Sequence, residues 1–273
     1  MIYSSYFKLN KKKKEETPLG QNYLAQKERT SLLIYVFCVG IGLLARVSYL
    51  IIYYIPVRDS YSYIEYIRQW EETGKIPEVA VPPFAMFLLK IPYHYWQYDI
   101  MIGGTIMNMM MGLFIILEIM FAINLLFNSP FATLSAGLIA ATHPKLVQYS
   151  VGLLRENSYL MFICLSGVSL CYYFKKNKIE AIIGCGIFVA MCNLCRIEGI
   201  EILFICTLII AFSETNGHRD SILKKLICIM LIIVSYVSTL FILARCLNID
   251  EQDFIRYFEY GKHHVDKSLN DYE

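Results

Sequence analysis

IMIGGTIMNMMMGLFIILEIMFAINLLF, residues 100–127, is the stretch that decides the fold. It carries one charged side chain, Glu118, and is longer than the roughly 20 apolar residues that a helix needs to cross a bilayer. Further apolar runs lie at Ser31–Ile55 (closed by Pro56), twice within Phe131–Phe174 with a break near His143–Pro144, twice within Ile179–Phe212 with a break near Arg196, and at Leu226–Leu247. The sequence therefore predicts an all-α integral membrane protein with about seven transmembrane helices.

The composition agrees with a membrane protein. Of the 273 residues, 56% are hydrophobic and only 18% are charged, whereas a soluble domain carries about 25% charged residues. The net charge of +2 gives no basic surface for nucleic acid, so no nucleic-acid partner is expected. The nine cysteines fall in or beside apolar runs, and we interpret them, including the Cys192–Cys195 C-x-x-C, as small hydrophobic residues rather than disulfide, metal or redox groups.

Lysine and arginine in the short connections predict the orientation. Residues 1–30 form a basic segment that contains Lys11–Lys14, and the connections at 175–178 and 218–225 are also basic. Because cytoplasmic loops carry the excess of these residues, we expect all three on the cytoplasmic side of a multi-spanning domain at 31–247. The segments 56–99, 143–156, near 196 and the polar tail 248–273 then lie outside, and the first span serves as an anchor rather than a cleaved signal.

The long outer loop, 56–99, is predicted to carry an interfacial helix. Ser62 and Glu65 have the spacing of a capping box, and Gly74 and Pro77 give a stop signal. Between them, aromatic residues recur at helical spacing, which is typical of a helix that lies flat at the membrane surface. The later aromatic stretch, residues 93–96, is typical of an aromatic belt.

Two acidic residues on the predicted outer side are candidates for catalysis. Asp59 follows the first span closely and could act as a general base on an acceptor hydroxyl, or it could cap the following helix. Glu156 lies where the chain re-enters the membrane, where it could bind a divalent ion or orient an acceptor. Alternatively, it caps a helix and pairs with Arg155 or Lys145.

Basic residues on the same side are candidates for binding an anionic substrate. Arg196 interrupts an apolar run, and its planar guanidinium suits a phosphate diester. The alternative is a pair with Glu198 or Glu201 that ties two short helices together. Arg58 and His143 are further candidates, although a histidine at a helix break also serves as an interfacial hydrogen bonder.

Two charged residues within the predicted spans are given structural roles. Arg46 lies in the outer half of the first span, and we expect its side chain to snorkel towards the outer surface. Glu118 is deeper and closer to the cytoplasmic side, where we expect a buried polar group outside the site.

A set of short stretches carries a resemblance to a known family. In order, they are Arg46-Val47-Ser48-Tyr49, Asp59-Ser60-Tyr61-Ser62-Tyr63-Ile64, Pro82-Pro83-Phe84, His143-Pro144-Lys145-Leu146, Tyr149-Ser150-Val151-Gly152-Leu153-Leu154-Arg155-Glu156 and Cys195-Arg196-Ile197-Glu198-Gly199. Together they resemble the multi-spanning glycosyltransferases of the GT-C fold, in particular the protein O-mannosyltransferase and aminoarabinose-transferase clan, over about residues 31–213.

The resemblance implies a reaction. In that family the acidic residue of the first outer loop is the catalytic base, and Asp59 takes its position here. The donor would be a polyprenyl-phosphate-linked sugar, and the acceptor a lipid, glycan or protein. Glu156 and Arg196 match positions associated with the site. The chain departs from the family in that Ser60, not a second acid, follows Asp59, and in that it ends at Glu273 without the further spans of many members.

The leading hypothesis is therefore an inverting glycosyltransferase in the cell membrane with its active site on the outer face. Asp59 would be the base, and Glu156 would position the acceptor or a metal. Arg58, His143, Lys145, Arg155, Arg196 and Glu198 would contact the substrates. Alternatives are a non-catalytic or truncated scaffold subunit and a transporter or flippase of an anionic lipid-linked substrate. The sequence indicates no repeat of the kind that transporters carry.

Overall fold

Every regular element in the described part of the chain is a helix. The computed structural model describes residues 18–53, 58–77, 82–97, 99–213 and 221–249. The helices are α2 (Pro18–Tyr53), α3 (Arg58–Thr73), α4 (Pro83–Trp96), α5 (Ile100–Phe127), α6 (Pro130–Thr142), α7 (Pro144–Val151), α8 (Arg155–Lys176), α9 (Glu180–Cys195), α10 (Gly199–Phe212) and α11 (Ile222–Cys246). The lysine run Lys11–Lys14, the pair His218–Arg219 and the tail 250–273 lie outside the described residues.

Four helices are long and apolar enough to cross a membrane: Ser31–Tyr53 of α2, and the whole of α5, α8 and α11. They indicate a membrane protein, as predicted. Helices α6, α9 and α10 are apolar but contain only 13, 16 and 14 residues. At 1.5 Å per residue, they reach about 20–24 Å, which is less than the thickness of the hydrocarbon core.

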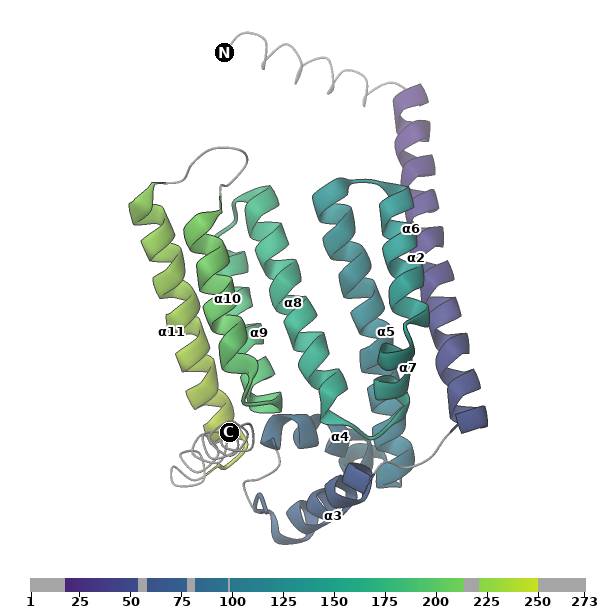
Figure 1. Cartoon of the computed structure of the whole chain (residues 1–273), viewed down its shortest axis with the longest axis vertical. Helices are drawn as coiled ribbons and strands as arrows, with labels where there is room; N and C mark the ends of the chain where they lie inside the picture. The colour runs from purple at the N-terminus through teal and green to yellow at the C-terminus, as the bar shows by residue number, and fades with distance from the viewer. Residues whose placement is uncertain (1–17, 54–57, 78–81, 98, 214–220, 250–273) are drawn as a thin grey trace, which may run out of the picture.

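The long helices stand side by side, and α3 and α4 lie across one end of them (Figure 1). Because successive upright helices alternate in direction, the α7–α8 and α9–α10 connections lie at this same end, as does the C-terminal end of α11. We call it the α3 end of the bundle. The α5–α6 and α8–α9 connections lie at the opposite end, which we call the lysine end because it carries Lys175, Lys176 and Lys178.

The predicted breaks are present, and one further break was missed. His143 has extended backbone angles (φ −60°, ψ 120°) and separates α6 from α7, because proline at 144 disfavours helical geometry in the preceding residue. Arg196 is also extended and ends α9. The further break, which the sequence did not predict, separates α7 from α8 and begins at Gly152 (φ −74°, ψ 154°). The run 131–174 therefore contains a short extra helix, α7.

Helix α3 starts earlier than predicted and buries its aromatic face. It begins at Arg58, so Ser62 lies inside the helix and not at its N-cap. Its predicted end is confirmed: Gly74 has a left-handed φ of 67°, and its N–H donates to the Trp70 carbonyl over 2.9 Å. Tyr63 and Trp70 are buried in the main apolar core with residues of α4. The aromatic face of α3 is thus covered by protein.

Arg46 does not snorkel, and that prediction is wrong. Its side chain is completely buried and donates to the carbonyls of Gly42 (2.9 Å), Gly112 (3.1 Å) and Ala141 (3.5 Å). These contacts join α2 to α5 and α6. A buried guanidinium is tolerated here because backbone carbonyls accept its hydrogen bonds. Glu118 is buried in α5, as expected.

All nine cysteines are free, and only Cys246 is exposed. Cys192 and Cys195 of the C-x-x-C are both fully buried, which agrees with their interpretation as small apolar residues.

Changing Gly112 to alanine is expected to destabilise the fold by about 1–3 kcal/mol. A Cβ atom there would lie 1.9 Å from Ser150 Oγ and 3.0 Å from Arg46 Nε, both of which are buried. The thermal unfolding midpoint of the detergent-purified protein measures the effect. Gly40→Ala is the matched control because nothing lies within 4 Å of its Cβ position. Equal midpoints for the two variants would contradict the packing described here.

The contact between α3 and α4 is expected to depend on pH. Glu71 accepts from His94 Nδ1 over 2.6 Å and pairs with Lys90 Nζ over 2.7 Å. Burial raises the pKa of Glu71, but the hydrogen bonds with Lys90 and His94 outweigh it and hold the pKa below the usual 4.5. Since the folded pKa is the lower one, this stabilisation is fully present above pH 4.5 and is lost as the pH falls through the lower value.

Hydrogen exchange of α3 between pH 3 and pH 6, corrected for the intrinsic pH dependence of exchange, tests this. We expect protection of α3 to fall on acidification in the wild type and to vary less in Glu71→Gln. Glu65→Gln is the control, because Glu65 is exposed and pairs only with Arg68 and Gln69 of its own helix in the described structure. An unchanged acid transition in Glu71→Gln would exclude this carboxyl as its origin.

Candidate functional site

A cluster of charged residues lies at the α3 end of the bundle and is centred on Arg196. Its Nη2 and Nε donate to the two oxygens of Glu198 over 2.8 and 3.3 Å. Its Nη1 donates to Glu156 Oε1 over 3.3 Å. Glu156 belongs to the first turn of α8, so Arg196 links α8 to the α9–α10 connection. The guanidinium carbon also lies 5.5 Å from the centre of the Tyr159 ring.

One of these pairs is among the local ones considered from the sequence, and the other is not. Arg196 pairs with Glu198, one of the two partners in the structural alternative. Glu156 pairs with Arg196, which is 40 positions away, and not with its neighbours Arg155 or Lys145. Only the fold brings these groups together.

The ions of the cluster reach solvent. The side chains of Glu156, Arg196 and Glu198 are 23%, 27% and 43% exposed. Hydrogen bonds from Arg196 hold the pKa of Glu198 below its usual value, and the same bonds raise the pKa of Arg196. Both groups therefore remain charged at neutral pH, and a soluble ion can approach them.

Tyr63 of α3 lies within electrostatic range of these charges, which the sequence did not predict. Its side chain is 5% exposed. Burial raises its pKa to about 12; Arg155 and Arg196 act to lower it, and Glu156 and Asp59 act to raise it. The phenol is thus within electrostatic reach of four charged residues and remains a hydrogen-bond donor at neutral pH. We call Tyr63, Arg155, Glu156, Arg196 and Glu198 the Arg196 cluster.

Two polar atoms of the cluster are buried and have no hydrogen-bond partner among the described residues: Arg155 Nε and Glu156 Oε2. Buried polar atoms are nearly always bonded to protein or water. A donor and an acceptor are therefore both available here to water or to a polar ligand.

Asp59 has an exposed side chain and is within electrostatic range of Tyr63. Asp59 lies in the first turn of α3 and not at the N-cap position before the helix. A negative charge in the first turn is favoured by the helix dipole. The start of α3 is fixed because Ser60 Oγ donates to the Leu153 carbonyl over 3.3 Å. A carboxylate held in this way is open to solvent and free to meet an acceptor.

The remaining predicted site residues lie elsewhere or outside the described side chains. His143 and Lys145 are exposed around the α6–α7 break. Lys145 donates to Gln148 of its own helix over 3.1 Å. Arg58 is the first residue of α3, and its side chain lies outside the described part of the structure. The structure thus joins Glu156, Arg196 and Glu198 through ion pairs, with Arg155 next to Glu156 in the chain, and Tyr63 lies within electrostatic range of Arg155, Glu156, Arg196 and Asp59.

Three asparagines that sequence reasoning missed hold the connections that carry the cluster. Asn108 Nδ2 donates to the carbonyls of Gly152 (2.6 Å) and Leu154 (3.0 Å), and Asn157 Nδ2 donates to the Asn108 carbonyl (2.6 Å). These bonds fix the α7–α8 connection to α5. A polar amide inside an apolar run is the signal that could have found them.

Asn193 does the same for the α9–α10 connection. It donates to the Ile197 carbonyl over 2.8 Å and accepts from Tyr236 of α11 over 3.2 Å. A Cβ atom on Gly199 would lie 2.4 Å from the Asn193 backbone. Only glycine therefore allows the chain to turn so tightly next to Arg196.

Metal binding was one role considered for Glu156. Within the residues that the structure describes, no three or more His, Cys, Asp or Glu side chains gather as a metal site would require. Glu156 and Glu198 are both engaged by Arg196.

No family model matches the chain, and no curated protein or solved structure shows detectable similarity to it.

Proposed function

We propose that this protein is a multi-spanning glycosyltransferase of the GT-C type in the cell membrane. In this proposal α2, α5, α8, α9, α10 and α11 cross the bilayer together with the broken pair α6–α7, and α3 lies at the outer interface. The lysine end is cytoplasmic. The alternating directions of these helices support the proposal (Figure 1), as does the basic connection between α8 and α9.

The reaction is transfer of a sugar from a polyprenyl-phosphate donor to a lipid, glycan or protein acceptor. Asp59 removes the proton of the acceptor hydroxyl as its oxygen bonds to the anomeric carbon. The bond from that carbon to the phosphate oxygen breaks, the configuration inverts, and polyprenyl phosphate leaves with the electron pair. Arg155 and Arg196 stabilise the charge that develops on the phosphate.

One observation carries the proposal: two arginines, two carboxylates and a buried phenol, supplied by α3, α8 and the α9–α10 connection, gather at one end of an apolar bundle. Charges are costly near the membrane, so their convergence favours a site for a charged ligand. Phosphate fits because it accepts from several donors at once. The 3.3 Å contact of Arg196 with Glu156 is longer than its 2.8 Å contact with Glu198, so a phosphate would displace Glu156 first.

The test is sugar transfer by the purified protein in liposomes, with a panel of radiolabelled polyprenyl-phosphate sugars and membrane lipid extract as the source of acceptor. Transfer from at least one carrier, with polyprenyl phosphate released in equal amount, is expected. A folded protein that transfers from none of them would refute the proposal.

A scaffold subunit is the second candidate, favoured by the same ion pairs. Arg196 already satisfies two carboxylates and ties α8 to the α9–α10 connection, which is what a purely structural role requires. This alternative predicts that Asp59, which is exposed, tolerates replacement without loss of function.

A further inference from the structure

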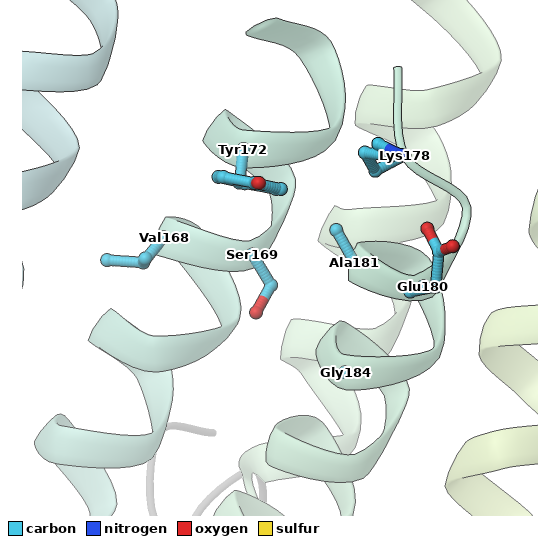
Figure 2. Close-up of a pocket in the computed structure, with 7 residues that line it drawn as sticks. All are labelled: Val168, Ser169, Tyr172, Lys178, Glu180, Ala181 and Gly184. Atoms are coloured by element: carbon cyan, nitrogen blue, oxygen red, sulfur yellow. The ribbon is translucent and has the colours of Figure 1, made fainter. Parts of the chain in front are cut away.

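A pocket lies at the lysine end, away from the Arg196 cluster. It has a volume of about 490 Å³ and opens between α8 and α9. Tyr172 and Ser169 line it from α8, and Glu180, Ala181 and Gly184 line it from α9, with Lys178 in the connection between the two helices (Figure 2). One wall is therefore made of small residues, and the mouth carries one charge of each sign.

The depth of the pocket matches the boundary between lipid headgroups and acyl chains. From Val168, which also lines it, to the end of α8 at Lys176 the helix rises about 12 Å. Tyr172 is 37% exposed, and tyrosine is enriched at this level of a membrane. The apolar part of the pocket would thus face acyl chains, and the charged mouth would face headgroups.

We propose that this pocket binds a phosphatidylethanolamine molecule of the bilayer. The Lys178 ammonium meets the lipid phosphate, the Glu180 carboxylate accepts hydrogen bonds from the lipid ammonium, and an acyl chain lies over Ala181 and Gly184. Both side chains are exposed, so a lipid headgroup can approach both charges. This site is independent of the proposed transferase reaction.

The charge pair decides between lipid classes. An anionic phosphatidylglycerol would bring its phosphate to Lys178 but would offer Glu180 no positive partner. Phosphatidylcholine carries a positive group without an N–H donor. Phosphatidylethanolamine alone among the three supplies both an acceptor for Lys178 and a donor for Glu180.

Native mass spectrometry of the detergent-purified full chain, titrated with each of the three lipids, tests the proposal. In the wild type we expect phosphatidylethanolamine to bind about two- to fivefold more tightly than the other two, the range for partly exposed charge pairs. Glu180→Gln should remove the preference over phosphatidylcholine, and Lys178→Ala should weaken binding of all three. Lys175→Ala is the control, because Lys175 is exposed and does not line the pocket.

Gly184→Leu provides a variant that leaves the charges unchanged. A Cβ atom at Gly184 meets only ordinary contacts, 3.6 Å from Ser169 and 3.9 Å from Phe188, so the fold tolerates it while the longer side chain fills the pocket. Loss of bound phosphatidylethanolamine in this variant is expected. Equal binding of the three lipids by the wild type, tighter binding of phosphatidylglycerol, or an unchanged preference in Glu180→Gln would each overturn the proposal.

Discussion

Replacing Asp59 with asparagine is expected to lower sugar transfer by about 10²–10⁴-fold, the usual contribution of a general base. Asparagine keeps the size of the side chain but cannot take the proton of the acceptor hydroxyl. Because Asp59 is exposed, the change should leave the fold intact. Donor binding should also persist, since the phosphate is assigned to Arg155 and Arg196.

The measurement compares turnover and donor binding in wild type, Asp59→Asn and Glu65→Gln. Glu65 is the matched control because it is an exposed carboxylate on the same helix, paired with Arg68 and Gln69. Lost turnover in Asp59→Asn alone, with the donor still bound, supports the assignment. Turnover close to that of the wild type in Asp59→Asn would remove Asp59 as the base.

Replacing Arg196 with alanine is expected to lower kcat/KM for the sugar donor by about 10²–10³-fold. This is the usual effect of removing one preorganised hydrogen-bond donor that stabilises charge in a transition state. The change also leaves Glu156 and Glu198 without their shared cation. Arg196→Lys should retain part of the activity. An ammonium keeps the charge but cannot reproduce the planar fork that holds both Glu198 oxygens and reaches Glu156.

Kinetics and thermal unfolding of the same samples separate binding from stability. Arg245→Ala is a suitable control because Arg245 is an exposed arginine in the last turn of α11, at the same end of the bundle. We expect kcat/KM per folded molecule to fall far more in Arg196→Ala than in Arg245→Ala. If Arg196→Ala only lowers the unfolding midpoint, Arg196 is a structural tie between α8 and the α9–α10 connection.

Much of the fold could be predicted because the membrane imposes strong local constraints. The run 100–127 matches α5 at both ends, since it has a single charge and is followed by Asn128, which adopts the left-handed conformation that ends many helices (φ 47°). The breaks at His143 and Arg196 were visible as a proline and a charge. The break at Gly152 was not, because glycine alone does not end a helix.

Other features depend on tertiary contacts that no local pattern reveals. Arg46 is buried because Gly42 and Gly112 leave space and carbonyls for its guanidinium. The start of α3 was placed too late because Ser62 and Glu65 have capping-box spacing within the helix. Of the seven predicted apolar runs, four form helices that are long and apolar enough to cross a membrane, and three form shorter helices.

The sequence allowed several residues of the candidate site to be predicted, but not most of the contacts between them. Arg196 and Glu198 are two residues apart, so their pair was open to local reasoning. The contact of Arg196 with Glu156 requires α8 and the α9–α10 connection to meet, and the electrostatic effect of these charges on Tyr63 requires the fold to bring α3 within range of them. Tyr63 also looked like one more aromatic residue of an amphipathic helix, because its spacing with Tyr66 and Trp70 explains it equally well.

The proposed transferase site lies at the α3 end and faces away from the cytoplasm. Transfer in sealed proteoliposomes, with a membrane-impermeant, short-chain polyprenyl-phosphate sugar supplied on one side only, tests both its activity and its sidedness. The orientation of the protein can be read from an impermeant maleimide on Cys246, the single exposed cysteine, which ends α11 at the α3 end. The account predicts transfer only when the donor is on the side where Cys246 is labelled. Transfer only from the lysine end, or none from either side by folded protein, would contradict it.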